Sequence, residues 1–468
     1  SAGIGSNDIG LDRGQIGGTR IIKFIKIGPK ILMVQPNYKF RALSENIEEI
    51  KSVNDAFARS TIWGFQIQAK SGTSYLIDAT EFAMRDSHMV STRLKRQNQG
   101  IFEIDNKSSS FDPRFSKNFP LNTEIESFLT FRGMATGRWL NSVSPSSESF
   151  SVRTRHSFIQ LPDEGYSPRK FDPRAGYGAM TFYDYASPID EDLHVKYIRR
   201  HRLIKKFPTQ ELSEPVEPII YYLDRGVPEP VKSALIDGAS WWNEAFESAG
   251  FKNAFQIKVL PEGADMLDVR YNVIQWVHRS TRGWSYGSSV VDPRTGEIIK
   301  GHVSLGSLRV RQDYLIAEGL LRPYVGDDGK NNDMKEMAIE RLRQLSAHEV
   351  GHTIGLSHNF ISSARERKSV MDYPHPLIKF SKNKVDLSEA YDKGIGEWDK
   401  LAINWGYREF QSNEQDQLNK ILQDGYKNDI YFISDQDSRP QGSAHPRSHL
   451  WDNGLDAADE LNRMLEIR

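Results

Sequence analysis

The sequence predicts an α+β protein in which a β-rich N-terminal domain precedes a domain built from a mixed, twisted sheet and helices. Apolar runs separated by turn residues fill residues 19–85, as in "TRIIKFIKIGPKILMVQP" and "WGFQIQAKSGTSYLID". From residue 219 onwards, short apolar runs alternate with longer segments of helical periodicity. Strands and helices that alternate in this way pack as layers around one core, which gives the fold class.

The N-terminal half holds one predicted helix, over residues 44–60, between two pairs of strands. Residues 100–190 predict short strands joined by polar loops, without a recognisable fold. The segment "KKFPTQELSEPVEP" (205–218) is rich in proline and charge and is the expected domain boundary. The predicted domains are 1–205, 206–410 and a C-terminal helical extension over 411–468, with truncation expected at both ends.

The second domain opens with a predicted strand at 219–224 and one helix over 228–250 that stops at Gly250. Further strands are expected at 255–261, 273–278, 288–292 and 297–306. The turn "DPRTGE" (292–297) joins the last two as a hairpin, and "DPRAG" (172–176) shares its turn chemistry.

Composition excludes several classes of protein. The 468 residues carry 61 basic and 62 acidic side chains, a formal charge of -1, so a nucleic-acid footprint is not expected. No apolar run approaches the ~18 residues that a membrane-spanning helix needs. The chain has no cysteine, which excludes disulfides, thiol catalysis and cysteine-ligated zinc.

The stretch "HEVGHTIGLSHN" (348–359) carries the strongest functional signal. A helix predicted from Asp333, its expected N-cap, places His348 and His352 on adjacent turns of one face, where both imidazoles can bind one ion. Gly355 can leave the right-handed helix and return His358 to the same point. Three imidazoles and a water form an open zinc site. The full pattern arises by chance on the order of once in ten thousand such chains.

This stretch resembles the metzincin signature. "SVMDYPHP" (369–376) supplies the Met-containing turn expected beneath the metal, with a Met-to-Tyr spacing similar to the astacin and serralysin branches. "GEWDKLAINWGY" (396–407) is similar to the closing helix of metzincin domains. "IGLDRGQIGGTRI", "RGWSYGSSVVDPRTGEIIKG" and "HLWDNG" extend the resemblance to large exported bacterial zinc metalloproteases whose flanking domains have no known function.

The resemblance implies a zinc metalloendopeptidase of protein or peptide substrates that lies outside the cytoplasm. It implies that zinc is held by His348, His352 and His358, with Glu349 as general base and a zinc-bound water as nucleophile. Tyr373 is expected either to ligate zinc at rest and stabilise the oxyanion, or only to pack under the Met-turn, at even odds. The family implies that substrate adds to a sheet edge, for which 288–292 and 300–306 are the candidates.

Two other functions stay open on the sequence. One is an inactive, metal-stapled binding protein, against which the presence of Glu349 argues. The other is a zinc amidase acting on non-protein amides. His302 is expected to be exposed or structural, and Asp372 to bond the backbone rather than the metal. The N-terminal half is expected to pack permanently on the catalytic domain, because its apolar strands at 21–35 and 62–78 need a partner surface. The oligomeric state is not predicted.

Overall fold

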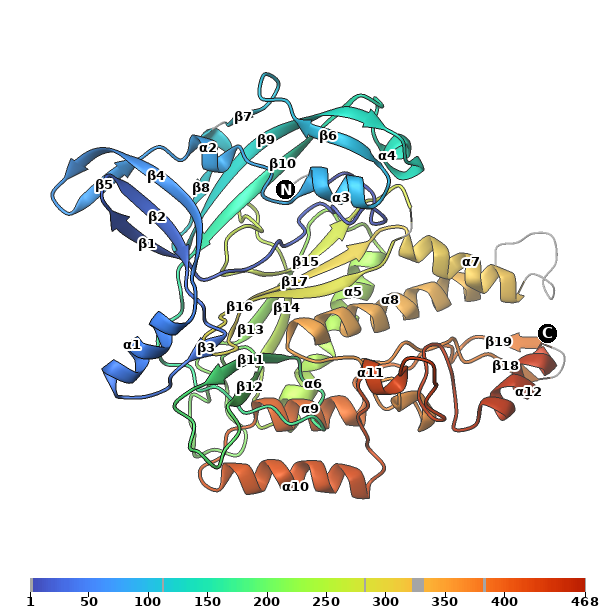
Figure 1. Ribbon diagram of the computed structural model, residues 1–468. Coiled ribbons are helices and arrows are strands. Elements are labelled where there is room, and N and C mark those ends of the chain that lie inside the picture. Colours follow the sequence, from blue (N-terminus) through green and yellow to red (C-terminus); the bar gives the residue numbers. More distant parts are fainter. Residues whose placement is uncertain (1–2, 112, 282, 322–331, 382–383, 468) are drawn as a thin grey trace.

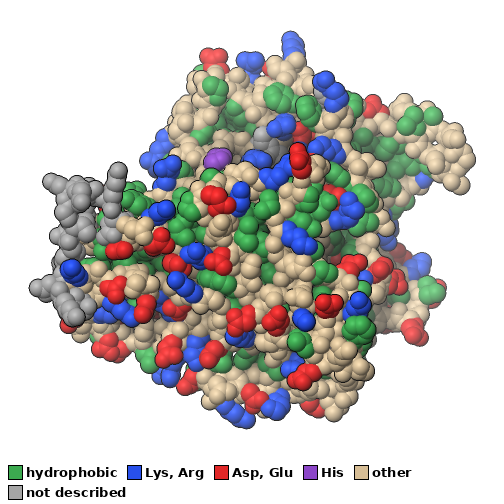
Figure 2. All heavy atoms as spheres, turned by 180° about the vertical axis from the view of Figure 1, so that it is seen from behind, with side chains coloured by type: hydrophobic (Ala, Val, Ile, Leu, Met, Phe, Trp, Pro, Cys, Tyr) green, Lys and Arg blue, Asp and Glu red, His purple; other side chains and the backbone are tan. Residues whose placement is uncertain are grey.

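The structure is a computed structural model that describes residues 3–111, 113–281, 283–321, 332–381 and 384–467. It confirms an α+β fold with a β-rich N-terminal region above a mixed sheet flanked by helices (Figure 1). Among the described residues, no helix has the length and apolar character needed to span a bilayer. Acidic and basic side chains are interspersed on the face shown in Figure 2, in keeping with the near-zero formal charge.

The first sheet of the N-terminal region has four strands, in the order β1-β2-β4-β5. Alternating apolar residues bury one face of it against Phe82, and tight turns at Gly28 and Gly72 close its hairpins. The helix expected at 44–60 is confirmed as α1. These elements are β1 (Lys23–Ile27), β2 (Lys30–Gln35), α1 (Ile47–Ala56), β4 (Ser60–Ser71) and β5 (Ser74–Ile77).

The second sheet corrects the expectation of short strands over residues 100–190. Its central strand β9 runs from Asn122 to Ala135 and pairs with β10 over the whole length of β10, Ser149–Ile159. The smaller elements around this pair are α2 (Thr80–Ala83), α3 (Val90–Arg96), β6 (Gly100–Ile104), β7 (Ser110–Phe111), a 3-10 turn (Pro113–Phe115), β8 (Lys117–Asn118) and α4 (Arg138–Val143).

A small third sheet links this region to the rest of the chain. It consists of β3 (Phe40–Arg41), β11 (Ala179–Asp184) and β12 (His194–Ile198).

The central sheet positions the site. Its order is β14-β13-β15-β17-β16, with parallel pairs up to β17 and the antiparallel strand β16 at the edge. Of the two predicted edge candidates, residues 288–292 therefore lie on the edge strand, whereas 300–306 lie inside the sheet. The strands are β13 (Ile219–Leu223), β14 (Phe255–Val259), β15 (Asn272–Val277), β16 (Tyr286–Val291) and β17 (Ile298–Gly306).

Helices cover one face of this sheet. The single helix predicted over 228–250 is two helices, because Trp241 interrupts it: α5 (Val231–Ser240) and α6 (Trp242–Ser248). The long helix α8 (Asn332–Thr353) packs on α5 and α7 (Arg309–Leu321) and includes Asn332, so Asp333 lies inside its first turn rather than at the cap. Side chains of these helices and of Tyr221, Ile274 and Val303 form the largest core.

The C-terminal part wraps around the lower side of the central sheet (Figure 1). The closing helix predicted at 396–407 is confirmed as α9. The elements are a 3-10 turn (Ser362–Ala364), β18 (Lys379–Ser381), β19 (Lys384–Asp386), α9 (Glu397–Tyr407), α10 (Glu414–Lys427), α11 (Asp435–Ser438) and α12 (Ala457–Ile467). Residue 468, the end of the expected last helix, lies outside the described residues. The two predicted boundaries between the three domains stay predictions.

The opposite face of the central sheet is polar and is covered by the first residues of the chain. Arg279 and Asp12 form an ion pair at 2.8 Å whose side chains are each 1% exposed. Tyr286 of β16 donates to the same carboxylate at 3.2 Å. The segment before β1 is therefore an internal layer between the central sheet and the N-terminal region.

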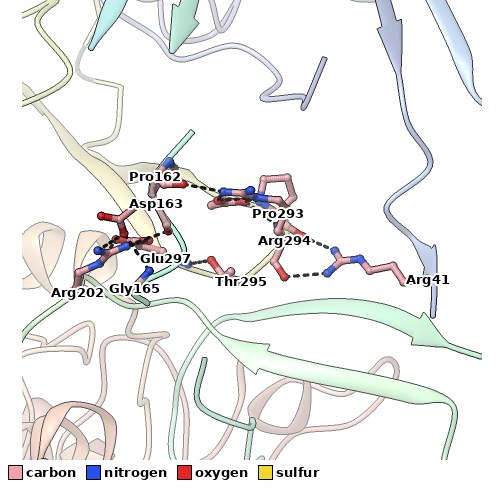
Figure 3. Close-up of polar contacts among 10 residues, drawn as sticks. Arg41, Pro162, Asp163, Gly165, Arg202, Pro293, Arg294, Thr295 and Glu297 are labelled. Carbon is pink, nitrogen blue, oxygen red and sulfur yellow. Dashed lines mark hydrogen bonds and ion pairs between the residues drawn. The ribbon is translucent and has the colours of Figure 1, made fainter. Parts of the chain in front are cut away.

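The hairpin turn 292–297 is a second point of attachment. Arg41 donates to the carbonyl oxygens of Pro293 and Arg294, and Arg202 pairs with Glu297 at 2.8 Å (Figure 3). Guanidinium groups from the N-terminal half thus hold the tip of the β16–β17 hairpin from two sides.

Candidate metal centre

Glycine at position 351 lets the Met371 turn approach helix α8 directly. A Cβ added to Gly351 would lie 2.2 Å from Sδ of Met371 and 2.8 Å from the ring of Trp242. Met371 is fully buried there. The expected Met-containing turn beneath the histidines is therefore present, and the glycine that precedes His352 makes room for it.

Gly355 ends the helix as expected. Its φ of +110° lies in the region that favours glycine, and an added Cβ would lie 2.0 Å from the carbonyl oxygen of Arg199. Its own carbonyl accepts from the N–H of Gly178 at 2.9 Å, and the N–H of Ser357 donates to Gly176 at 2.8 Å. A segment of the N-terminal half thus fixes the turn that reverses the chain towards His358.

The structure brings the three predicted histidines together. One nitrogen each from His348, His352 and His358 lies within 4.8 Å of the other two. The closest pair is Nε2 of His352 and Nε2 of His358, at 3.2 Å. Among the residues that the structure describes, this is the group of side chains placed to share a metal ion.

Each of these imidazoles has an acceptor on its other nitrogen. Nδ1 of His348 lies 2.8 Å from the carbonyl oxygen of Val370, and Nδ1 of His352 lies 2.9 Å from that of Leu356. Nδ1 of His358 lies 2.8 Å from Oδ2 of Asp435. With the proton held on Nδ1, the lone pairs of the three Nε2 atoms are available to a ligand.

A zinc ion fits this cluster. Nε2 of His348 is buried and has no hydrogen-bond partner in the described part of the chain, a cost that a metal bond would remove. Burial is the main cause that lowers the pKa of His348 well below its usual value and that of His352 to about 4. Neutral imidazole is the form that binds metal, so the three-histidine cluster is consistent with zinc.

Glu349 lies beside the triad and not among its nitrogens. It is 5% exposed, and burial raises its pKa to about 8 against the opposing charges of Arg341 and Arg309. A Cβ at Gly287, in the edge strand β16, would lie 2.3 Å from the carbonyl oxygen of Glu349 and 2.9 Å from Cβ of His352. The predicted base and the sheet edge are therefore adjacent.

Tyr373 lies over the histidines. Its ring centroid is 5.2 Å from that of His348 and 4.6 Å from that of His358. Its other face stacks with Trp451 at 6.1 Å, and Trp451 is 61% exposed. The tyrosine is thus at the site, and an aromatic side chain from the C-terminal part screens it from solvent.

Asp372 accepts hydrogen bonds from backbone N–H groups, as expected. It accepts from the hydroxyl of Ser362, from the N–H of Ser363 and from the N–H of Tyr373, at 2.7–2.8 Å. Burial nevertheless raises its pKa to about 7. His302 is buried in β17, so of its two expected placements the exposed one is wrong.

Asp435 and Trp451 are the site residues that the sequence did not reveal, whereas Asn359 was expected only to cap the end of the helix or the loop after it. The side chain of Asn359 donates to the carbonyl oxygen of Tyr431 at 2.9 Å and accepts from the N–H of Ile433 at 3.3 Å. These bonds fix the chain that leads into α11, whose first residue is Asp435. No local pattern marks an aspartate 77 residues after its histidine.

Two family models match the chain. Residues 330–468 match the model described as Met-zincin. Residues 14–206 match the model described as Domain of unknown function (DUF5117). No curated protein sequence matches the chain. The Met-zincin match contains all three clustered histidines, so the family match and the metal geometry coincide.

Proposed function

Because residues 330–468 of this chain are a Met-zincin domain and residues 14–206 a DUF5117 domain, we propose that the protein is a zinc metalloendopeptidase. One observation carries the proposal. The three imidazoles converge on one point, the Nδ1 atom of each has an oxygen acceptor, and Glu349 lies beside them. His348, His352 and His358 would hold the zinc ion. When bound, the ion supplies Lewis acidity for the scissile carbonyl and acidifies water.

The chain's own residues perform the proton transfers. Glu349 takes a proton from the attacking water and passes it to the leaving amine. Burial favours its neutral form and raises its pKa to about 8. The positive charge of a bound zinc ion would favour the carboxylate form, which is the form that accepts the proton. Tyr373, whose ring lies next to His348 and His358, donates a hydrogen bond from its hydroxyl to the developing oxyanion.

The substrate is a protein or peptide in extended conformation. Strand β16 is the last strand of its sheet in the described chain, so one row of its backbone groups is available for pairing. Gly287 of this strand is adjacent to Glu349. A peptide added to the edge therefore passes the base and the triad. We also propose, from the resemblance alone, that the protein acts outside the cytoplasm.

The decisive experiment is Glu349→Gln in the full chain. Zinc content measured by inductively coupled plasma mass spectrometry stays at one per chain, and cleavage of a peptide library falls by about 10²–10⁴. Glu336→Gln, an exposed position on the same helix, is the matched control and keeps full activity.

Three outcomes overturn parts of the proposal. Undiminished cleavage in Glu349→Gln removes the assigned base. Zinc binding without cleavage of any peptide in the native protein favours the metal-stapled binding protein. Cleavage restricted to a panel of non-peptide amides favours the amidase.

A further inference from the structure

A large cavity lies on the other face of the central sheet from the histidines. Its volume is about 950 Å³, and its walls come from β1, β10, β16, β17 and the chain segments 13–22 and 82–93. None of the three clustered histidines, Glu349 or Tyr373 lines it. His302 of β17 lines it, whereas the neighbouring positions Gly301 and Val303 point towards the core on the helix side of the sheet. The cavity is therefore separate from the proposed catalytic site.

Three basic side chains gather on one wall of this cavity. The guanidinium carbon of Arg85 lies 4.3 Å from the ring centre of Phe82, and the imidazole of His156 lies 4.5 Å from the same centre. His88 lines the same wall beside the loop at Gly17, where a Cβ would lie 3.4 Å from its ring. Burial, then the charges of Arg85 and His88, lower the pKa of His156 to about 4.

Arg85 has an unused donor, and each of the two imidazoles has a ring nitrogen without a partner. Nε of Arg85 and Nε2 of both His88 and His156 are buried and have no hydrogen-bond partner among the residues that the structure describes. Nε2 of His302, whose residue is 8% exposed and which lines the same cavity, is also without a partner there. Buried polar groups in folded proteins are almost always bonded, so this concentration points to a missing acceptor.

The chain itself does not supply that acceptor. Arg85 has no ion-pair partner within the described ranges, and the exposed Arg20 adds a further positive charge to the lining. The carboxylates that line the cavity are already engaged by donors of the chain: Glu124 by Asn122 and Ser157, Asp265 by Lys117, and Asp292 by Arg294. An anion from solution would accept from Arg85 and would favour the forms of His88 and His156 that carry a proton on Nε2.

An aromatic surface adjoins the basic cluster. The ring of Phe158 lies 6.2 Å from that of Phe82 and 6.4 Å from that of Phe24, and all three line the cavity. Phe24 is 53% exposed although it lies beside these rings. A ligand with an apolar part would bury this surface, whereas an inorganic ion would leave it uncovered.

We propose that this cavity binds a small organic anion with an apolar chain. Its charged group lies among Arg85, His88 and His156, and its chain lies on Phe24 and Phe158. The recognised chemistry is an alkyl carboxylate or an alkyl phosphate. The site adds a ligand-binding function to the N-terminal region and is independent of the peptidase activity.

Isothermal titration calorimetry on the full-length Glu349→Gln protein tests the proposal without any contribution from turnover. The probes are octanoate, octyl phosphate, inorganic phosphate and octanol. We expect at least one of the two alkyl anions to bind with a Kd below ~1 mM, and phosphate and octanol each to bind ~10-fold more weakly or not at all. The alkyl anion that binds more tightly shows whether the site prefers a carboxylate or a phosphate group.

Two variants locate the binding. Arg85→Gln and His156→Gln each weaken the better probe by about 10-fold or more, because a bond to a charged group is lost. Arg96→Gln, an exposed residue at the end of α3 outside the cavity, leaves the Kd unchanged. Thermal unfolding without ligand shows whether each variant is folded.

Absence of binding by both alkyl anions up to ~10 mM overturns the proposal. So does binding that neither Arg85→Gln nor His156→Gln weakens. Equal binding of octanol and octanoate would mean an apolar pocket without an anion site, and would also overturn it. None of these outcomes bears on the zinc site.

Discussion

The imidazole of His358 donates through Nδ1 to Oδ2 of Asp435 over 2.8 Å. The aspartate is the first residue of α11, and its side chain is 46% exposed. A carboxylate behind a ligating histidine orients the ring, fixes its tautomer and increases its basicity. The C-terminal part of the chain therefore supports the third member of the triad directly.

Asp435→Asn is predicted to lower the affinity for zinc by about 10–100-fold while the fold is kept. Competition with a fluorescent chelator measures the affinity without reference to turnover. Asp437→Asn, in the same short helix but bonded to Ser434, is the matched control. Equal zinc affinity in the two variants would show that the aspartate contributes nothing to the metal centre.

Tyr373→Phe is predicted to reduce kcat by about 10²-fold with little change in KM, because the hydroxyl is required mainly as charge develops on the carbonyl oxygen. Steady-state kinetics on one peptide substrate measures both constants. The phenylalanine ring keeps the contacts with His348 and Trp451. A rise in KM at constant kcat would instead assign Tyr373 to substrate binding.

Asp12→Ala is predicted to destabilise the protein by about 3–5 kcal/mol, because Arg279 is left as a buried charge without its partner. The urea midpoint, followed by tryptophan fluorescence, reports the change. Arg13→Gln on the same segment is the control: Arg13 is 51% exposed and lies 4.0 Å from Asp224, so its loss costs less than ~1 kcal/mol. Equal effects would contradict a structural role for the buried pair.

Stability is predicted to fall as the pH drops from about 6.5 towards 4, in part because of His201. Burial lowers the pKa of this residue to about 4, and its Nε2 lies 3.1 Å from the hydroxyl of Tyr221. In this window the unfolded chain binds a proton that the folded chain does not, so stability is lost at up to ~1.4 kcal/mol per pH unit. His201→Gln flattens the profile of unfolding midpoint against pH; an unchanged slope would contradict the assignment.

The sequence predicted the centre of the site because its chemistry depends on local geometry. Two histidines one helical turn apart and a glycine that reverses the chain bring three imidazoles together whatever the rest of the fold is. Asp435 and Trp451 were missed for the opposite reason. They reach the site through tertiary contacts, such as the hydrogen bond between Asn359 and Tyr431. Residue spacing in the sequence does not predict such contacts.

The errors in the fold have physical causes of the same kind. Strand β9 buries Glu124 and Glu126, so its inward positions did not look apolar and the strand was expected to be short. The predicted helix over 228–250 is interrupted after Ser240, whose hydroxyl bonds the carbonyl oxygen of Ile236 and competes with the backbone. Strand β17 was an edge candidate because sheet order is not encoded in single strands.

The buried ion pair between Asp12 and Arg279 also determines when, during translation, the protein can complete its fold. The two residues are separated by 267 positions. At about 5–20 residues per second, a ribosome exposes Asp12 tens of seconds before Arg279 emerges. The N-terminal β-sheets can assemble on the nascent chain during that interval, but the segment from Gly5 to Asp12 cannot find its final place. Completion of the molecule therefore awaits the synthesis of the central sheet.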